Sequence, residues 1–169
     1  MPNRVLVIGY GNPGRMDDGL GPALAAALEA DPVPGVTVDA DYQLTVEDAA
    51  DVARHDWVIL ADAAVQGREP FAFYEVRPAP ALSFSSHSVE PGALLTLATD
   101  LFAAKTRMYT IAIRGYSFAG FGEALTRGAR RNLDSAIAFL RESLVEGEFR
   151  PSRPPDADRM APAEACSLN

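Results

Sequence analysis

Uninterrupted apolar runs predict the central strands of a largely parallel sheet. Residues 4–8, 57–61 and 108–113 lack the alternation of polar and apolar positions that a half-exposed strand shows. Runs of this kind are typical of strands covered on both faces, which requires helices above and below the sheet. Residues 36–42 do alternate, so they predict a further strand with one apolar face.

Helical segments separate most of these strands. Residues 23–30 are strong helix formers and follow Pro22, which is favoured at a first helical position. A short helix is expected over 46–54, with Thr45 and Asp48 forming a capping box at its start. Two more helices are expected, over 90–104 and around an apolar stripe made of Ala129, Leu133, Ala136, Ile137, Leu140 and Leu144.

One strand is expected to run against the others. Residues 71–76 carry large side chains at alternating positions, and the turn before them, 63–69, is too short for a helical crossover. Strands that alternate with helices pair in parallel. The pattern therefore predicts an α/β fold with a mixed, mostly parallel sheet.

The composition favours a single domain followed by a tail. With 169 residues, of which 48% are hydrophobic, the chain is long enough for one well-buried core, which we expect within residues 1–146. Residues 147–169 are rich in proline and polar residues and predict a disordered C-terminal tail. Because Cys166 is the single cysteine, an intrachain disulfide and a thiolate metal cluster are excluded.

The charge limits the class of partner. The formal net charge is −8 and the isoelectric point is near 4.7, which argues against nucleic acid or an anionic membrane as the main partner. No apolar run approaches the roughly 20 residues that span a bilayer. The first strand starts too early for a signal peptide, so a cytoplasmic protein is expected. Four arginines of the last helix are expected largely on its solvent faces rather than in a binding patch: Arg127, Arg130, Arg131 and Arg141.

The loop after the first strand carries candidate chemistry. It spells Gly-x-Gly-x-x-Gly from Gly9 onward, a pattern shared with dinucleotide-binding loops. Two observations argue against a nucleotide: Pro13 lacks an amide donor, and Asp17 and Asp18 would repel a diphosphate. The two carboxylates suit a cation; alternatively, one of them caps the following helix.

Two further residues are candidates for the same site. Asp62 closes the predicted strand at 57–61, and parallel strands bring their carboxyl ends to one edge of the sheet, so Asp62 and Asp18 can converge. His87 lies on a polar loop just before the helix at 90–104. Taken singly, Asp62 can also be a turn residue that closes the strand, and a lone histidine on a loop is more often solvated or structural than a ligand.

A set of short motifs resembles one enzyme family. They are Gly9-Tyr10-Gly11-Asn12-Pro13, Asp17-Asp18-Gly19-Leu20-Gly21, Gln43-Leu44-Thr45, Ala61-Asp62-Ala63 and Ser86-His87-Ser88. Over roughly residues 4–145, about the size of one domain, the chain resembles the nickel-iron hydrogenase maturation endopeptidases. The resemblance implies a three-layer α/β/α sandwich with a five-strand mixed sheet and one antiparallel strand. It also implies removal of the C-terminal extension of a nickel-iron hydrogenase large subunit precursor after nickel insertion.

The resemblance further implies a metal site. Its catalytic, metal-contacting residues are expected to be Asp18, Asp62 and His87, beside a substrate loop of Gly11, Asn12, Asp17 and Gln43. Two carboxylates and an imidazole suit a divalent ion that keeps open positions for water or a peptide carbonyl. The ion is expected to be nickel, either resident or delivered by the substrate, with zinc or another divalent ion as a substitute. The first-loop acid is Glu in some family members and Asp here, which shortens its reach.

The sequence thus predicts a monomeric, cytoplasmic processing endopeptidase whose partner is a hydrogenase large subunit precursor, without nucleic acid or membrane insertion. No nucleophile elbow and no cysteine in the folded region offers a rival nucleophile. Two alternatives stay open: a noncatalytic metal- or nucleotide-sensing module on the same scaffold, and a dinucleotide-dependent oxidoreductase.

Overall fold

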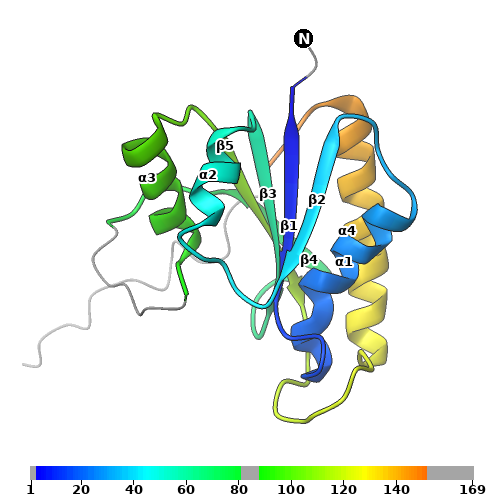
Figure 1. Ribbon diagram of the computed structural model, residues 1–169. Coiled ribbons are helices and arrows are strands. Elements are labelled where there is room, and N and C mark those ends of the chain that lie inside the picture. Colours follow the sequence, from blue (N-terminus) through cyan, green and yellow to red (C-terminus); the bar gives the residue numbers. More distant parts are fainter. Residues whose placement is uncertain (1–2, 81–87, 152–169) are drawn as a thin grey trace, which may run out of the picture.

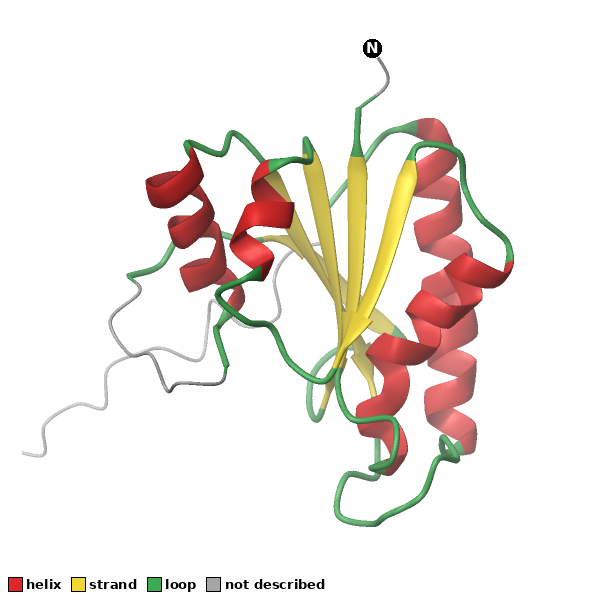
Figure 2. Ribbon diagram, viewed as in Figure 1, coloured by secondary structure: helices red, strands yellow, loops and turns green. Residues whose placement is uncertain are grey.

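The computed structural model describes residues 3–80 and 88–151, which form a five-stranded sheet between two layers of helices (Figure 1, Figure 2). The strands are β1 (Val5–Tyr10), β2 (Val36–Asp41), β3 (Trp57–Ala64), β4 (Phe71–Glu75) and β5 (Arg107–Arg114). Their order is β2-β1-β3-β5-β4, and neighbouring strands are parallel except for the pair β4 and β5. The predicted mixed sheet and its antiparallel strand are confirmed.

Helices cover both faces of this sheet. A short 3₁₀ helix, η1 (Met16–Gly19), leads into α1 (Leu20–Ala30), which packs beside α4 (Arg127–Glu146) on one face. The other face is covered by α2 (Asp48–Ala53) and α3 (Pro91–Phe102). The arrangement is the three-layer sandwich that the resemblance implies. Within the described ranges, no helix has both the length and the apolar character needed to cross a membrane.

Successive residues of the central strands enter two different cores. In β1, Val5 and Val7 pack with residues of α1 and α4, whereas Leu6 and Ile8 pack with residues of α2 and α3. Both faces of the strand are therefore apolar, which explains why its sequence shows no polar alternation. Each side chain of this kind contributes about 1.5–3 kcal/mol when it is fully buried.

Two glycines let α1 approach the sheet closely. A Cβ atom added at Gly9 would lie 2.1 Å from the carbonyl oxygen of Gly21, and one added at Gly21 would lie 2.4 Å from those of Tyr10 and Ala61. Any larger residue would push the helix away from the strands. This contact fixes the position of the segment between β1 and α1, residues 11–19, which we call the acid loop.

Three local details differ from the sequence-based expectation. Asp62 lies within β3 rather than after it, because β5 keeps pairing with β3 as far as Ala64. Helix α1 begins at Leu20, directly after η1, so Pro22 lies inside its first turn. At α2 the Asp48 carboxylate accepts from the Thr45 amide at 2.7 Å, but the Thr45 hydroxyl donates to that carboxylate instead of capping the helix. Only half of the capping box forms.

Phe149 extends the packed core past the expected end of the domain. Its ring contacts Trp57 and Tyr109, with centroid distances of 4.7 and 5.4 Å. The sequence predicts that the tail begins at residue 147, whereas packing continues to Phe149 because aromatic rings of β3 and β5 offer it an apolar surface. Residues 152–169, which include Cys166, lie outside the described residues.

Arg141 connects α4 to the end of α1. Its guanidinium donates to the carbonyl oxygens of Ala27 at 3.0 Å and Asp31 at 2.8 Å, and it lies 3.0 Å from the Asp31 carboxylate. Carbonyls at a helix end have no intrahelical partner and attract cations. The expectation that Arg141 faces solvent is therefore wrong, and its side chain is only 26% exposed.

Candidate active site

Asp18 and Asp62 lie at the carboxyl end of the parallel strands, where the winding of the chain reverses. From β1 the chain turns through α1 to β2, and it then crosses back to β3 on the other side of β1. Ligands of α/β sheets collect at such a switch point. Asp18 lies in η1, directly after β1, and Asp62 lies near the end of β3. The structure thus brings these two predicted residues to one edge of the sheet.

Asp62 is a half-buried carboxylate with a raised pKa. Burial is the largest cause, and the charges of Asp18 and Glu90 add to it, so that the pKa of Asp62 rises to about 6. Hydrogen bonds from the Tyr10 hydroxyl and from the Ala63 amide, at 2.8 Å, favour the ionised form but are outweighed. Asp62 therefore changes charge close to neutral pH, as groups in catalytic sites often do.

Tyr10 holds Asp62 from the neighbouring strand. Burial, followed by the charge of Asp62 and their hydrogen bond, raises the pKa of Tyr10 far above its usual value. The phenol consequently stays protonated and donates to the carboxylate. The Gly9–Ala61 pairing places Tyr10 directly beside Asp62, so this hydrogen bond follows from the strand register.

Glu90 is a charged neighbour of Asp62 that the sequence interpretation did not single out. It is the N-cap residue of α3, and its charge raises the pKa of Asp62, of Tyr10 and of Tyr74. A negative charge raises the pKa of an acidic group in this way when the two groups lie close together. A signal was available, because Glu90 precedes Pro91 at a helix start and follows His87 by three residues.

The backbone amides of the acid loop already donate hydrogen bonds to other protein groups. The Asn12 amide donates to the Asp18 carboxylate at 2.8 Å, the Asn12 side chain accepts from the Gly14 amide at 2.9 Å, and the Gly11 amide donates to the Asp41 carbonyl. Gly11 has φ near +140°, and a Cβ there would lie 2.1 Å from the Asp18 carbonyl oxygen. Because these amides are occupied, they are not free to hold a pyrophosphate, which argues against the dinucleotide-dependent alternative.

Asp17 is a buried residue that connects the acid loop to the segment before α4. Its side chain is 0% exposed, and its carboxylate accepts hydrogen bonds from the Thr126 amide and hydroxyl at 2.8 and 2.7 Å, and from the amides of Tyr116 and Ser117 at 2.8 and 3.1 Å. Burial raises the pKa of Asp17, but these hydrogen bonds outweigh it and lower the pKa below its usual value. Neither acid of the pair caps α1, whose N-cap residue is Gly19 without a side-chain cap.

Of the two remaining predicted site residues, the structure describes Gln43 but not His87. Gln43 is exposed on the loop between β2 and α2, and the amide of Val89 donates to the Leu44 carbonyl beside it at 3.0 Å. His87 lies outside the described residues. Within residues 3–80 and 88–151, no three histidine, cysteine or acidic side chains are placed to hold a metal ion together. The carboxylates of Asp18 and Asp62 offer oxygen donors of the type that divalent ions accept.

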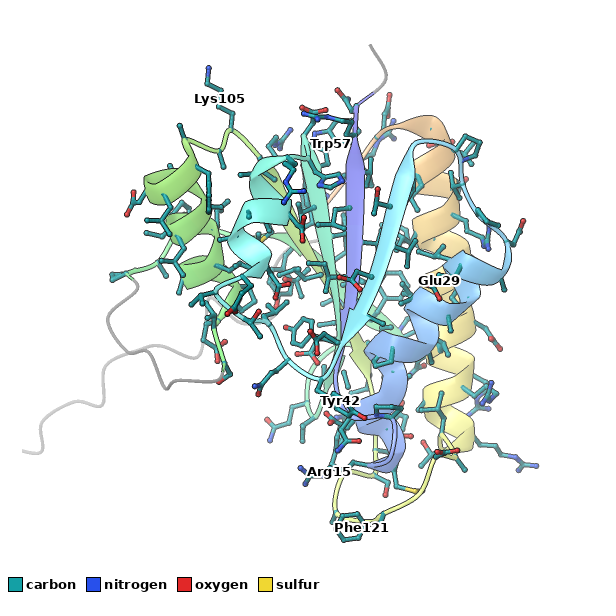
Figure 3. The ribbon with its side chains drawn as sticks, in the orientation of Figure 1. Arg15, Glu29, Tyr42, Trp57, Lys105 and Phe121 are labelled. Atoms are coloured by element: carbon teal, nitrogen blue, oxygen red, sulfur yellow. The ribbon has the colours of Figure 1, made fainter. Side chains whose placement is uncertain are left out.

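Several exposed apolar side chains lie at the same edge of the sheet as the acids. They lie on loops that follow the carboxyl ends of β2, β3 and β5, and Figure 3 shows two of them, Tyr42 and Phe121, at the same end of the molecule as Arg15. Phe121 is 95% exposed and Tyr42 is 68% exposed. We call this set the apolar rim: Tyr42, Val46, Val65, Tyr116 and Phe121.

A small cavity borders the acid loop inside this rim. Its volume is about 220 Å³, and part of its wall is the side chain of Tyr42. Its lining is mainly apolar apart from one acid: Gly11, Pro13, Pro22, Ala40, Asp41 and Tyr42. A cavity of this size beside Gly11 and Pro13 of the acid loop can hold one side chain of a peptide.

No protein-family model and no curated protein matches the sequence. Solved structures do match. The NiFe hydrogenase maturation protease HycI from Thermococcus kodakarensis KOD1 matches with a TM-score of 0.65 at 19% identity, over 85% of this chain and 93% of that one. The hydrogenase maturating endopeptidase HybD from E. coli matches with a TM-score of 0.62 at 24% identity, over 85% of this chain and 93% of that one.

A third structure gives the same result. The hydrogenase 2 maturation peptidase from Thaumarchaeota archaeon SCGC_AB-539-E09 matches with a TM-score of 0.62 at 22% identity, over 84% of this chain and 98% of that one. All three similarities cover nearly the whole of the known proteins, so they concern the complete domain rather than a shared sheet. This chain therefore has the fold of the hydrogenase maturation proteases.

Proposed function

We propose that this protein is an endopeptidase that removes the C-terminal extension of a nickel-iron hydrogenase large subunit precursor after nickel insertion. The observation that carries the proposal is the pair Asp18 and Asp62. These two half-buried carboxylates come from separate segments and lie at the same edge of the sheet, at the switch point of a fold shared with hydrogenase maturation proteases. The proposed set of metal-contacting residues is Asp18, Asp62 and His87.

The chemistry of the two acids suits metal-assisted hydrolysis. A nickel ion carried by the precursor, for which zinc could substitute in a test, would polarise the scissile carbonyl and lower the pKa of an attached water. Asp18 and Asp62 would supply oxygen ligands from the protein side. At neutral pH Asp62 is mostly ionised, since its pKa is about 6, so its carboxylate is available as an oxygen ligand.

The surroundings of the acids suit a protein substrate. The apolar rim lies at the same edge of the sheet as the two acids, and exposed apolar side chains that gather in one region commonly mark a surface that binds another protein. A rim of this kind would contact the folded body of the precursor, while the 220 Å³ cavity would take one side chain of its C-terminal segment. We propose that the enzyme acts as a monomer in the cytoplasm.

Gel mobility of a large subunit precursor tests the proposal. Wild-type protein is expected to shorten the nickel-loaded precursor once, near its C-terminus, and to leave the nickel-free precursor intact. Nickel binding without any cleavage would favour the noncatalytic sensing module instead. Cleavage of the nickel-free precursor at the same rate would contradict the role of nickel, because the ion is then not needed to polarise the carbonyl.

A further inference from the structure

Three arginines at the start of α4 line two neighbouring hollows in the surface. Arg127, Arg130 and Arg131 are exposed, and their spacing of three and four residues places them on one face of the helix. Two adjoining cavities, of about 610 and 430 Å³, share Arg127 and Arg131 as lining residues. We call this surface the arginine groove; besides the three arginines it is lined by Glu69, Tyr116, Leu125, Thr126, Gly128 and Asn132.

The three arginines differ from most others in the described part of the chain. Arg4, Arg54, Arg107, Arg141 and Arg150 each form an ion pair with an acidic side chain. Within residues 3–80 and 88–151, the three groove arginines form no such ion pair, although the chain carries a net charge of −8. The one acid that lines the groove, Glu69, accepts a hydrogen bond from the Tyr116 hydroxyl.

The groove is joined to the acid loop through two residues, Thr126 and Tyr116. Thr126 lines the larger cavity and also gives its amide and hydroxyl to the Asp17 carboxylate. Tyr116 lines the same cavity, belongs to the apolar rim, and gives its amide to Asp17. A protein docked on the rim would therefore meet the arginine groove as it extends away from Asp18.

We propose that the arginine groove binds an acidic segment of the protein substrate. The identity of that substrate rests on the proposed function; the affinity for an acidic peptide does not. The charge is complementary, and guanidinium groups bind carboxylates with paired hydrogen bonds. The groove extends over two cavities, which suits a stretch of peptide better than a single small anion. The expectation that Arg127, Arg130 and Arg131 form no binding patch is thereby revised.

Fluorescence anisotropy with a labelled heptaglutamate peptide tests the groove directly. The full-length triple variant Arg127→Gln, Arg130→Gln, Arg131→Gln is expected to bind the peptide about tenfold more weakly than wild type. A matched control, Arg4→Gln, Arg54→Gln, Arg150→Gln, changes the same number of exposed charges at the opposite end of the sheet and should bind within about twofold of wild type. An Arg→Lys triple variant of the groove keeps the charge but loses the paired hydrogen bonds, so its affinity should lie between those of wild type and the Gln variant.

Cleavage of the nickel-loaded precursor provides a second test of the arginine groove. The groove triple variant is expected to raise KM about tenfold with kcat unchanged, because a docking contact acts on binding rather than on chemistry. If the wild-type protein cleaves no precursor, the proposed function is wrong, but the peptide-binding experiment still tests whether the arginine groove binds acidic peptides. Equal peptide binding by wild type and the groove variant would overturn the inference. An unchanged KM would overturn it too, as would tighter binding of a single-stranded oligonucleotide than of the peptide.

Discussion

The carboxylate of Asp17 holds both the amide and the hydroxyl of Thr126, a residue 109 positions later in the chain. The same two segments are joined by backbone hydrogen bonds, from the Met16 amide to the Gly122 carbonyl and from the Gly122 amide to the Gly14 carbonyl, both at 2.8 Å. The loop before α4 and the acid loop therefore form one unit. The position of Asp18, next along the chain from Asp17, depends on this connection.

Replacing Asp17 with Asn should destabilise the protein. A buried carboxylate that accepts four hydrogen bonds becomes an amide whose NH₂ group faces donors, so we expect a loss of about 3 kcal/mol in the free energy of unfolding. Urea denaturation measures this loss. The matched control Asp100→Asn changes an exposed acid on α3 and should stay within about 0.5 kcal/mol of wild type. Equal stability of the two variants would contradict the structural role of Asp17.

The pKa of Asp62 should respond to Glu90. Burial is the main reason that the pKa of Asp62 is raised and the negative charge of Glu90 adds to it, so Glu90→Gln should lower that pKa slightly from about 6. Carbon-13 NMR of the side-chain carboxyl groups measures the titration. Glu29→Gln removes an exposed charge on α1 and should leave the pKa of Asp62 unchanged. An unchanged pKa of Asp62 in the Glu90→Gln variant would show that the two residues are not neighbours.

The contributions of Asp62 and Asp17 to the free energy of unfolding should also depend on pH in opposite directions. The folded-state pKa of Asp62 is raised, so its contribution is fully present below its unfolded pKa and is lost as the pH rises through about 6. The folded-state pKa of Asp17 is lowered, so its contribution is present above its unfolded pKa and is lost as the pH falls below it. Urea denaturation of wild type and Asp62→Asn at pH 4 and pH 7 should therefore show wild type losing stability relative to the variant at pH 7.

Two truncations separate the packed part of the tail from the rest. A chain ending at Gly147 loses Phe149 and its contacts with Trp57, Phe73 and Tyr109, so its thermal midpoint should fall by several degrees. The half-buried ring contributes about 1–2 kcal/mol. A chain ending at Pro151 keeps these contacts and should melt like the full-length protein. The same midpoint for both truncations would show that Phe149 adds nothing to the core.

Much of the fold can be predicted from sequence because it depends on strong local patterns. The buried strands have apolar runs, and the short turn before Phe71 leaves no room for a crossover helix, which is why the antiparallel β4 is predicted correctly. Asp18 and Asp62 can be placed together because both follow or end parallel strands. These features need only residue type and spacing.

Other features depend on contacts between distant segments, which spacing does not reveal. The burial of Asp17 requires donors from a loop about 100 residues later, so the two adjacent acids look alike in the sequence. Phe149 looks like part of a polar tail until the aromatic rings of β3 and β5 are placed beside it. Arg141 and Glu90 gain their roles in the same way, from α1 and from β3 respectively.

The most direct test of the central claim is the mass of the product formed from a nickel-loaded hydrogenase large subunit precursor. Asp18→Asn and Asp62→Asn each remove one negative charge with little change in shape, and Asp100→Asn does the same at a distant surface. The account predicts that wild type and Asp100→Asn yield the shortened subunit, whereas Asp18→Asn and Asp62→Asn, although folded, leave the precursor at full length. A shortened subunit formed at the wild-type rate by either site variant would contradict the claim that these two acids carry out the cleavage.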